Sequence, residues 1–222
     1  VSNYPEDWRG YYSRSLVYFE DKKPEHVISI LEPVSDTFNK IYSIQYLLGL
    51  GHNQLKQFDD ARRYFSRALT IRPDSPNVLH SMAILYDEVK EWEKSDEIYL
   101  RLINTDSTDA QAFNNYAYSL VERNHKLKRA LTLAKKAITL EPENASYLDT
   151  IGWIYFKLDN HEKAREYIES SIRINGENAI VLEHLGDVLM KIQKTEDALD
   201  YYKRALSLDK DNARLINKVS PE

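Results

Sequence analysis

Apolar and polar residues alternate most regularly between residues 145 and 178. The first part of this stretch places apolar or small residues at i, i+3, i+4 and i+7 of a helical period: Leu148, Ile151, Gly152 and Tyr155. After a turn at residues 158–161, the second part forms a similar line with Ala164, Ile168 and Ser171. The pattern therefore predicts two amphipathic helices joined by a short turn.

The same block recurs 34 residues further along the chain, where identical residue types coincide: Gly152 with Gly186, Ala164 with Ala198, Tyr167 with Tyr201 and Asn178 with Asn212. A fixed period of this length indicates a solenoid of helical hairpins, each too small to bury its apolar face without a neighbour. We predict five repeats, at 42–75, 76–109, 110–144, 145–178 and 179–212. The third carries one extra residue, which we place in its inter-helix turn at 123–126.

The two ends of the chain depart from the period. The residue pattern of 1–41 predicts a divergent helical hairpin that acts as an N-terminal cap, and we expect Pro33 to end its second helix. Residues 213–222 predict the stub of a capping helix or a tail. We expect this stub to leave Leu199, Tyr202 and Leu206 partly uncovered, which predicts self-association through the C-terminal end.

Two sets of recurring residues support the predicted boundaries. Small residues occupy the eighth position of every repeat, where they allow paired helices to approach closely: Gly49, Ala83, Ala117, Gly152 and Gly186. Residues that cap helices well precede each new first helix: Ser75, Asp109, Asn144, Asn178 and Asn212.

Composition excludes several classes of function. The net charge of −5 disfavours nucleic acid and anionic membrane surfaces, which attract basic proteins. No cysteine is present and the six histidines show no ligand spacing, so we predict neither a metal nor another cofactor. No nucleophile or acid–base motif indicates catalysis, and no apolar run reaches the length of a membrane span. Because the chain begins at Val1 without a leader, we expect a trimmed or mature fragment.

The pattern resembles the tetratricopeptide-repeat (TPR) family. The match shows in Leu48-Gly49, Ala61, Phe65, Ala68 and Pro73 of the first regular repeat and in Ala117, Ala130, Ala137 and Pro142 of the third. The resemblance implies an all-α, right-handed superhelical solenoid of antiparallel helix pairs. The segments LEPEN, SYLDTIGWIYFKL and VLEHLGDVLMKI are also similar to C-terminal repeats of bacterial TPR proteins, many of them envelope-associated. This likeness favours a bacterial origin and leans towards the cell envelope, with the cytoplasm left open.

The resemblance also projects a concave groove onto the first helix of each repeat. The projected residues are Asn77, His80, Gln111, Asn114, Asn115, Tyr118, Asp149, Thr150, Trp153, Phe156, Glu183 and Asp187. Amide side chains can hold a peptide backbone, and Tyr118 and Trp153 offer flat apolar area. Groove positions carry Asp87, Asp149, Glu183 and Asp187 but no lysine or arginine, which favours a polar or basic ligand over a carboxylate. The alternative is that the polar residues are merely solvated and the aromatic residues pack between turns.

We therefore predict a non-catalytic module that binds a peptide or a partner helix in this groove. A self-assembling scaffold that uses the ends or faces of the solenoid is the main alternative. A regulatory part of a longer enzyme is a more distant one.

Overall fold

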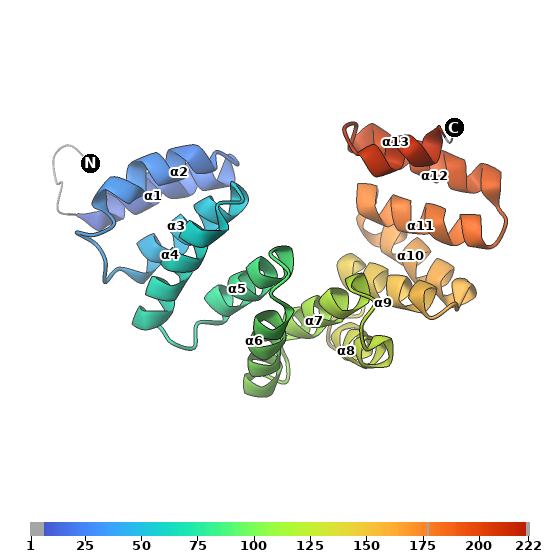
Figure 1. The fold of residues 1–222 in the computed structure, drawn as a ribbon, viewed down its shortest axis with the longest axis horizontal. Helices are drawn as coiled ribbons and strands as arrows, with labels where there is room; N and C mark the ends of the chain where they lie inside the picture. The colour runs from blue at the N-terminus through green and yellow to red at the C-terminus, as the bar shows by residue number, and fades with distance from the viewer. Residues whose placement is uncertain (1–6, 177, 221–222) are drawn as a thin grey trace. The chain divides into compact units, whose positions relative to one another are not determined.

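The computed structural model describes residues 7–176 and 178–220, and all regular structure in these ranges is helical (Figure 1). It comprises thirteen α-helices and one short 3-10 helix, without a strand in the described part of the chain. The helices fall into two compact units, Val1–Thr105 and Asp106–Glu222. The predicted all-α array of antiparallel helix pairs is confirmed.

The first unit contains three helical hairpins. Its helices are α1 (Trp8–Glu20), α2 (Pro24–Leu31), α3 (Tyr42–Gln54), α4 (Phe58–Ile71), α5 (Pro76–Glu88) and α6 (Trp92–Thr105). Pro33 lies in the 3-10 helix Glu32–Val34, directly after α2, because proline cannot continue the α-helical hydrogen bonds. Val27, Leu31, Ile44 and Leu48 form the centre of a core that joins the first two hairpins.

The second unit contains three further hairpins and a final helix. Its helices are α7 (Ala110–Glu122), α8 (Leu127–Leu140), α9 (Ala145–Lys157), α10 (His161–Asn175), α11 (Ala179–Lys191), α12 (Thr195–Leu208) and α13 (Ala213–Val219). Figure 1 shows α13, in red, beside α12 at the end of the chain. Leu215 of α13 is completely buried, so this short helix extends the core of the unit.

Left-handed residues close the turns within the hairpins. Lys56 has a φ of 57°, and the next amide, Gln57 N–H, donates to the carbonyl of His52. This closure satisfies carbonyl groups that the end of a helix leaves unpaired. The turn between α7 and α8 contains two such residues, Asn124 and Lys126, in the segment where the sequence carries its extra residue.

Small residues permit the expected close approach of paired helices. A Cβ atom on Gly186 would lie 2.4 Å from the Tyr202 ring, and one on Gly152 would lie 2.6 Å from Ile168 Cγ1. Neither distance is possible for a real side chain without movement of the neighbour. The eighth position therefore sets how closely the two helices of a hairpin pack.

Four of the five predicted capping residues act as N-caps. The side chains of Asp109, Asn144, Asn178 and Asn212 each accept hydrogen bonds from backbone N–H groups in the first turn of the following helix. The prediction is wrong for Ser75, which makes no such bond. Its hydroxyl pairs instead with the Tyr42 hydroxyl at 2.7 Å, a contact with the start of its own repeat, 33 residues away, that its sequence neighbours do not reveal.

Candidate functional site

In each repeat, we call the helix that comes first in sequence the first helix. The first helices α5 and α7 each expose one stripe of residues at i, i+4, i+7 and i+11. On α5 the stripe consists of Asn77, Ser81, Ile84 and Glu88. On α7 it consists of Gln111, Asn115, Tyr118 and Glu122, which we call the α7 stripe. Most other residues of these two helices are buried, so the stripes are the surfaces that α5 and α7 offer to a ligand.

An amide pair borders the α7 stripe. Asn114 is only 6 % exposed, and its Nδ2 donates to Asn115 Oδ1 at 3.5 Å. Asn114 Oδ1 is buried and accepts no hydrogen bond from the described residues. A buried acceptor without a donor costs about 1–3 kcal/mol, so a ligand donor that this oxygen meets when the Asn114 side chain turns toward the α7 stripe would be bound favourably.

The projected residues of the first unit lie on α5. Asn77 is exposed, and its carbonyl accepts hydrogen bonds from the Ser81 hydroxyl at 2.9 Å and the Tyr46 hydroxyl at 3.4 Å. His80 is buried, with 8 % of its surface exposed. Of these two projected residues, only Asn77 offers its side chain to solvent.

The structure differs most from expectation at Trp153. This side chain is 7 % exposed and does not offer a flat surface to a ligand. Its ring stacks on His184, with centroids 4.0 Å apart, and on Phe156, with centroids 4.8 Å apart. Its Nε1 donates to Glu122 Oε1 at 2.9 Å. Trp153 therefore ties α7, α9 and α11 together.

Asp149 and Thr150 are buried beside this cluster. Asp149 is 6 % exposed, and its two oxygens lie 3.0 and 3.1 Å from His184 Nδ1. The Thr150 hydroxyl donates to the carbonyl of Ser146 at 3.0 Å within its own helix. Asp149 therefore contributes to packing between repeats, and neither residue offers its polar group to an exposed surface.

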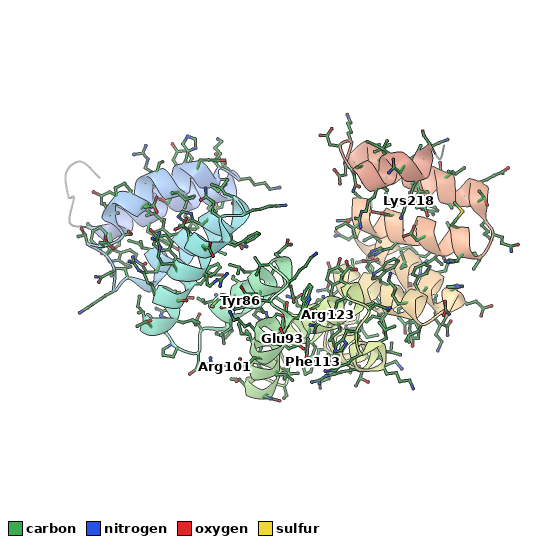
Figure 2. The ribbon with its side chains drawn as sticks, viewed as in Figure 1. Tyr86, Glu93, Arg101, Phe113, Arg123 and Lys218 are labelled. Carbon is green, nitrogen blue, oxygen red and sulfur yellow. The ribbon has the colours of Figure 1, made fainter. Side chains whose placement is uncertain are left out.

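The acidic residues on α11 have partners from α13. Lys218, labelled in Figure 2, donates to Glu183 Oε1 at 2.9 Å and to Asp187 Oδ1 at 2.5 Å. Arg214 lies 3.4 Å from the other oxygen of Glu183, which is buried. The sequence argument for a basic ligand at this end therefore fails, because the chain supplies its own cations.

Tyr202 is also covered, contrary to the expectation of an open C-terminal end. It is 3 % exposed, and its hydroxyl donates to Asp187 Oδ1 at 2.6 Å. Burial raises the pKa of Tyr202, and the hydrogen bond to the Asp187 carboxylate raises it further. Leu199 and Leu206 are partly buried. In the first unit, Asp87 is paired in a similar way with the hydroxyl groups of Ser95 and Tyr99.

Sequence reasoning missed three exposed apolar side chains on the first helices. Ile84 is 40 %, Ile180 50 % and Met190 38 % exposed. They occupy the ninth, second and twelfth positions of their repeats, which are groove positions of the same projection. Applying that projection to apolar residues as well as polar ones would have identified them.

Two absences hold for residues 7–176 and 178–220. No group of three or more His, Cys, Asp or Glu side chains in these ranges is arranged to hold a metal ion. None of the helices there combines the length and apolar character that crossing a bilayer requires.

Comparisons with known proteins agree with the helical array. The chain is 28 % identical to the type IV pilus assembly protein PilF of Pseudomonas aeruginosa over 126 residues, which cover 56 % of this chain and 50 % of PilF. It is 27 % identical to the human cell division cycle protein 16 homolog over 134 residues, or 56 % of this chain and 22 % of that protein. The chain thus spans half the length of the first relative and about a fifth of the second.

Solved structures show the same architecture. The structure of Pseudomonas aeruginosa PilF has a TM-score of 0.68 at 27 % identity, with 80 % of each chain covered. PilW, described as a widely conserved type IV pilus biogenesis factor, has a TM-score of 0.79 at 14 % identity, with 96 % of this chain and 98 % of PilW covered. The second likeness concerns the fold alone.

The family profile described as tetratricopeptide repeat matches residues 40–217, which is most of the chain. This match agrees with the observed hairpins and with the small residues that set their packing. The chain belongs to the tetratricopeptide-repeat family.

Proposed function

We propose that this chain is a non-catalytic protein-binding module whose ligand, a peptide or a partner helix, lies against the first helices of its repeats. We take residues 42–212 as five such repeats. The TPR fold supports a role in protein–protein interaction. The ligand and its position on the first helices are our proposal.

The observation that carries the proposal is the buried Asn114 oxygen beside the α7 stripe. A peptide N–H group is a neutral donor found in every extended segment, and Asn114 Oδ1 has no donor among the described residues. Asn115 and Tyr118, which are half-buried, provide an amide and an aromatic ring next to it. This combination suits main-chain recognition with one apolar contact, and it does not require a charged ligand.

Crosslinking at the α7 stripe tests the proposed position. A photoreactive phenylalanine derivative would replace Tyr118 in one variant and Lys136, an exposed residue of α8, in the control. Ligands selected from a random peptide library on the unmodified protein should crosslink to the Tyr118 variant and not to the control. Equal crosslinking at both positions, or crosslinking only at Lys136, would place the ligand elsewhere.

Self-assembly is a second candidate, and exposed apolar side chains near the C-terminal end favour it. Leu208 is 52 % and Ile216 45 % exposed. We propose that copies associate through these residues rather than through Tyr202. Light scattering over a concentration series should show a rising mass that Leu208→Glu abolishes, whereas a constant mass at every concentration would contradict this proposal.

A bacterial envelope location is also a proposal. It is supported by the similarity to the pilus assembly protein PilF of Pseudomonas aeruginosa. Fractionation of cells that express the protein from its own gene would test it. Recovery of the protein only from the soluble cytoplasmic fraction would contradict it.

A further inference from the structure

An acidic surface pocket lies in the first unit, formed by α2, α3 and α4. Its volume is about 410 Å³, and its lining includes the carboxylates of Glu25, Glu32 and Asp60. Ile28 and Leu55 add apolar surface to it. None of the described residues that line the pocket is a lysine or an arginine.

A buried histidine supplies the second observation. His52 lines the pocket and is only 4 % exposed. Its Nδ1 donates to Gln57 Oε1 at 2.7 Å. Nε2 has no hydrogen-bond partner among the described residues and lies 3.6 Å from Glu32 Oε1.

The negative charge of the pocket is only partly balanced from within the chain. Arg63 lies 2.8 Å from Asp60 and 3.7 Å from Glu32, and the Tyr64 hydroxyl donates to Glu32 Oε1. Glu25 forms neither an ion pair nor a hydrogen bond that involves its carboxylate within the described residues. Arg63 therefore pairs with two of the three carboxylates, and an added monocation would bring the pocket closer to neutrality.

We propose that this pocket binds a lysine or arginine side chain of a partner protein. The charged head group donates hydrogen bonds to the carboxylates of Glu25, Glu32 and Asp60, close to the buried His52 ring. The methylene stem packs on Ile28 and Leu55, both of which are half-buried. The pocket uses other helices than the α7 stripe, so this inference stands apart from the proposed function.

Nuclear magnetic resonance of the His52 ring tests the inference. The probe is a blocked pentapeptide with one central lysine among glycine and alanine residues, and the same peptide with Nε-acetyl-lysine is its neutral match. We expect the lysine peptide to shift the His52 Cε1–H signal saturably and the acetylated peptide to leave it in place. Loss of the signal in His52→Gln assigns it.

Charge-neutralising variants locate the contact. Glu25→Gln and Asp60→Asn should each weaken binding of the lysine peptide by about two- to fivefold, the range for a partly exposed ion pair. Asp59→Asn is the matched control, because Asp59 precedes Asp60 on α4, is fully exposed and does not line the pocket. Its affinity should equal that of the unmodified protein. Glu25→Gln removes no ion pair or hydrogen bond within the described chain, although it removes a favourable charge from the first turn of α2, so its urea unfolding is measured beside the binding.

Three outcomes would overturn the inference. An equal shift with the acetylated peptide would show that the positive charge is not recognised. Equal weakening by Asp59→Asn and Asp60→Asn would show general attraction to the acidic surface. A shift with spermidine but not with the lysine peptide would assign the pocket to a small polyamine. None of these results concerns the α7 stripe, which is tested with different variants.

Discussion

The close packing at Gly186 leads to a prediction in which a single methyl group destabilises the second unit. In Gly186→Ala the new Cβ would lie 2.4 Å from Tyr202 Cε1 and 2.6 Å from Cδ1. The ring cannot move aside easily, because Tyr202 is 3 % exposed and its hydroxyl is bound to Asp187. Either α11 and α12 separate or the ring shifts and weakens that hydrogen bond.

The change in the free energy of unfolding caused by Gly186→Ala is the balance of two destabilising effects and one stabilising effect. Overpacking costs typically about 1–3 kcal/mol, and weakening a hydrogen bond to a charged group costs up to about 1.5–3 kcal/mol. Replacing glycine by alanine inside a helix stabilises the helix by about 1 kcal/mol. If both costs apply in full, we expect a net loss of about 1.5–5 kcal/mol in the free energy of unfolding of the second unit.

Gly51→Ala is the matched control. Gly51 also lies within a first helix, but its Cβ would meet Ile28 Cγ1 at 3.4 Å, an ordinary contact. Without a clash the helix propensity dominates, and this variant should be up to about 1 kcal/mol more stable than the unmodified protein. Urea unfolding followed by circular dichroism should therefore give shifts of opposite sign for the two variants. A Gly186→Ala variant as stable as the unmodified protein would refute the packing argument.

A double-mutant cycle tests the cause of the destabilisation. Tyr202→Phe removes the hydroxyl that holds the ring to Asp187, so the ring can yield more easily. The loss caused by Gly186→Ala should be smaller in this background. An unchanged loss would show that the hydrogen bond does not restrain the ring.

Three further predictions concern stability. Trp153→Ala should lower the free energy of unfolding by about 3–5 kcal/mol, because it removes a buried ring; an unchanged urea midpoint would contradict the burial. Asn144→Ala should lower it by about 1 kcal/mol in the same assay as a lost N-cap, and no change would argue against the cap. Folding raises the pKa of Tyr202, so the folded chain holds the phenol proton more tightly than the unfolded chain does. The resulting contribution to the free energy of unfolding is complete below the ordinary tyrosine pKa of about 10 and is lost as pH rises above it. Urea unfolding at alkaline pH should therefore show a shallower decline for Tyr202→Phe than for the unmodified protein, and equal slopes would contradict this.

The helical array could be predicted because the residues that determine it recur in successive hairpins at a fixed period. Gly152 and Gly186 mark the closest approach of paired helices, and Asn144 and Asn178 mark the starts of first helices. Each of these signals depends on the fixed period and on partners in the same hairpin or in the first turn of the helix that follows. Ser75 shows the limit, since its hydroxyl is taken by Tyr42 from another helix.

The candidate site was less predictable because it depends on contacts between repeats. Trp153 has the spacing of an exposed groove residue, but His184 of the next repeat and Glu122 of the preceding one contact its ring. Glu183 and Asp187 look unbalanced in sequence, yet Lys218 lies against both of them. The position of a side chain within its own helix does not reveal hydrogen-bond partners that lie about 31–35 residues away in the sequence.

The measurement that tests the central claim most directly is the affinity of a selected peptide for variants of the α7 stripe. The test variant is Asn115→Ala/Tyr118→Ala, and the control is Lys135→Ala/Lys136→Ala on the exposed face of α8. Isothermal titration calorimetry would be run on variants whose urea unfolding matches that of the unmodified protein. We predict that the test variant binds at least about tenfold more weakly, since central interface contacts contribute more than about 1 kcal/mol each, and that the control is unchanged. Unchanged affinity in the test variant, with weaker binding in the control, would contradict binding at the first helices.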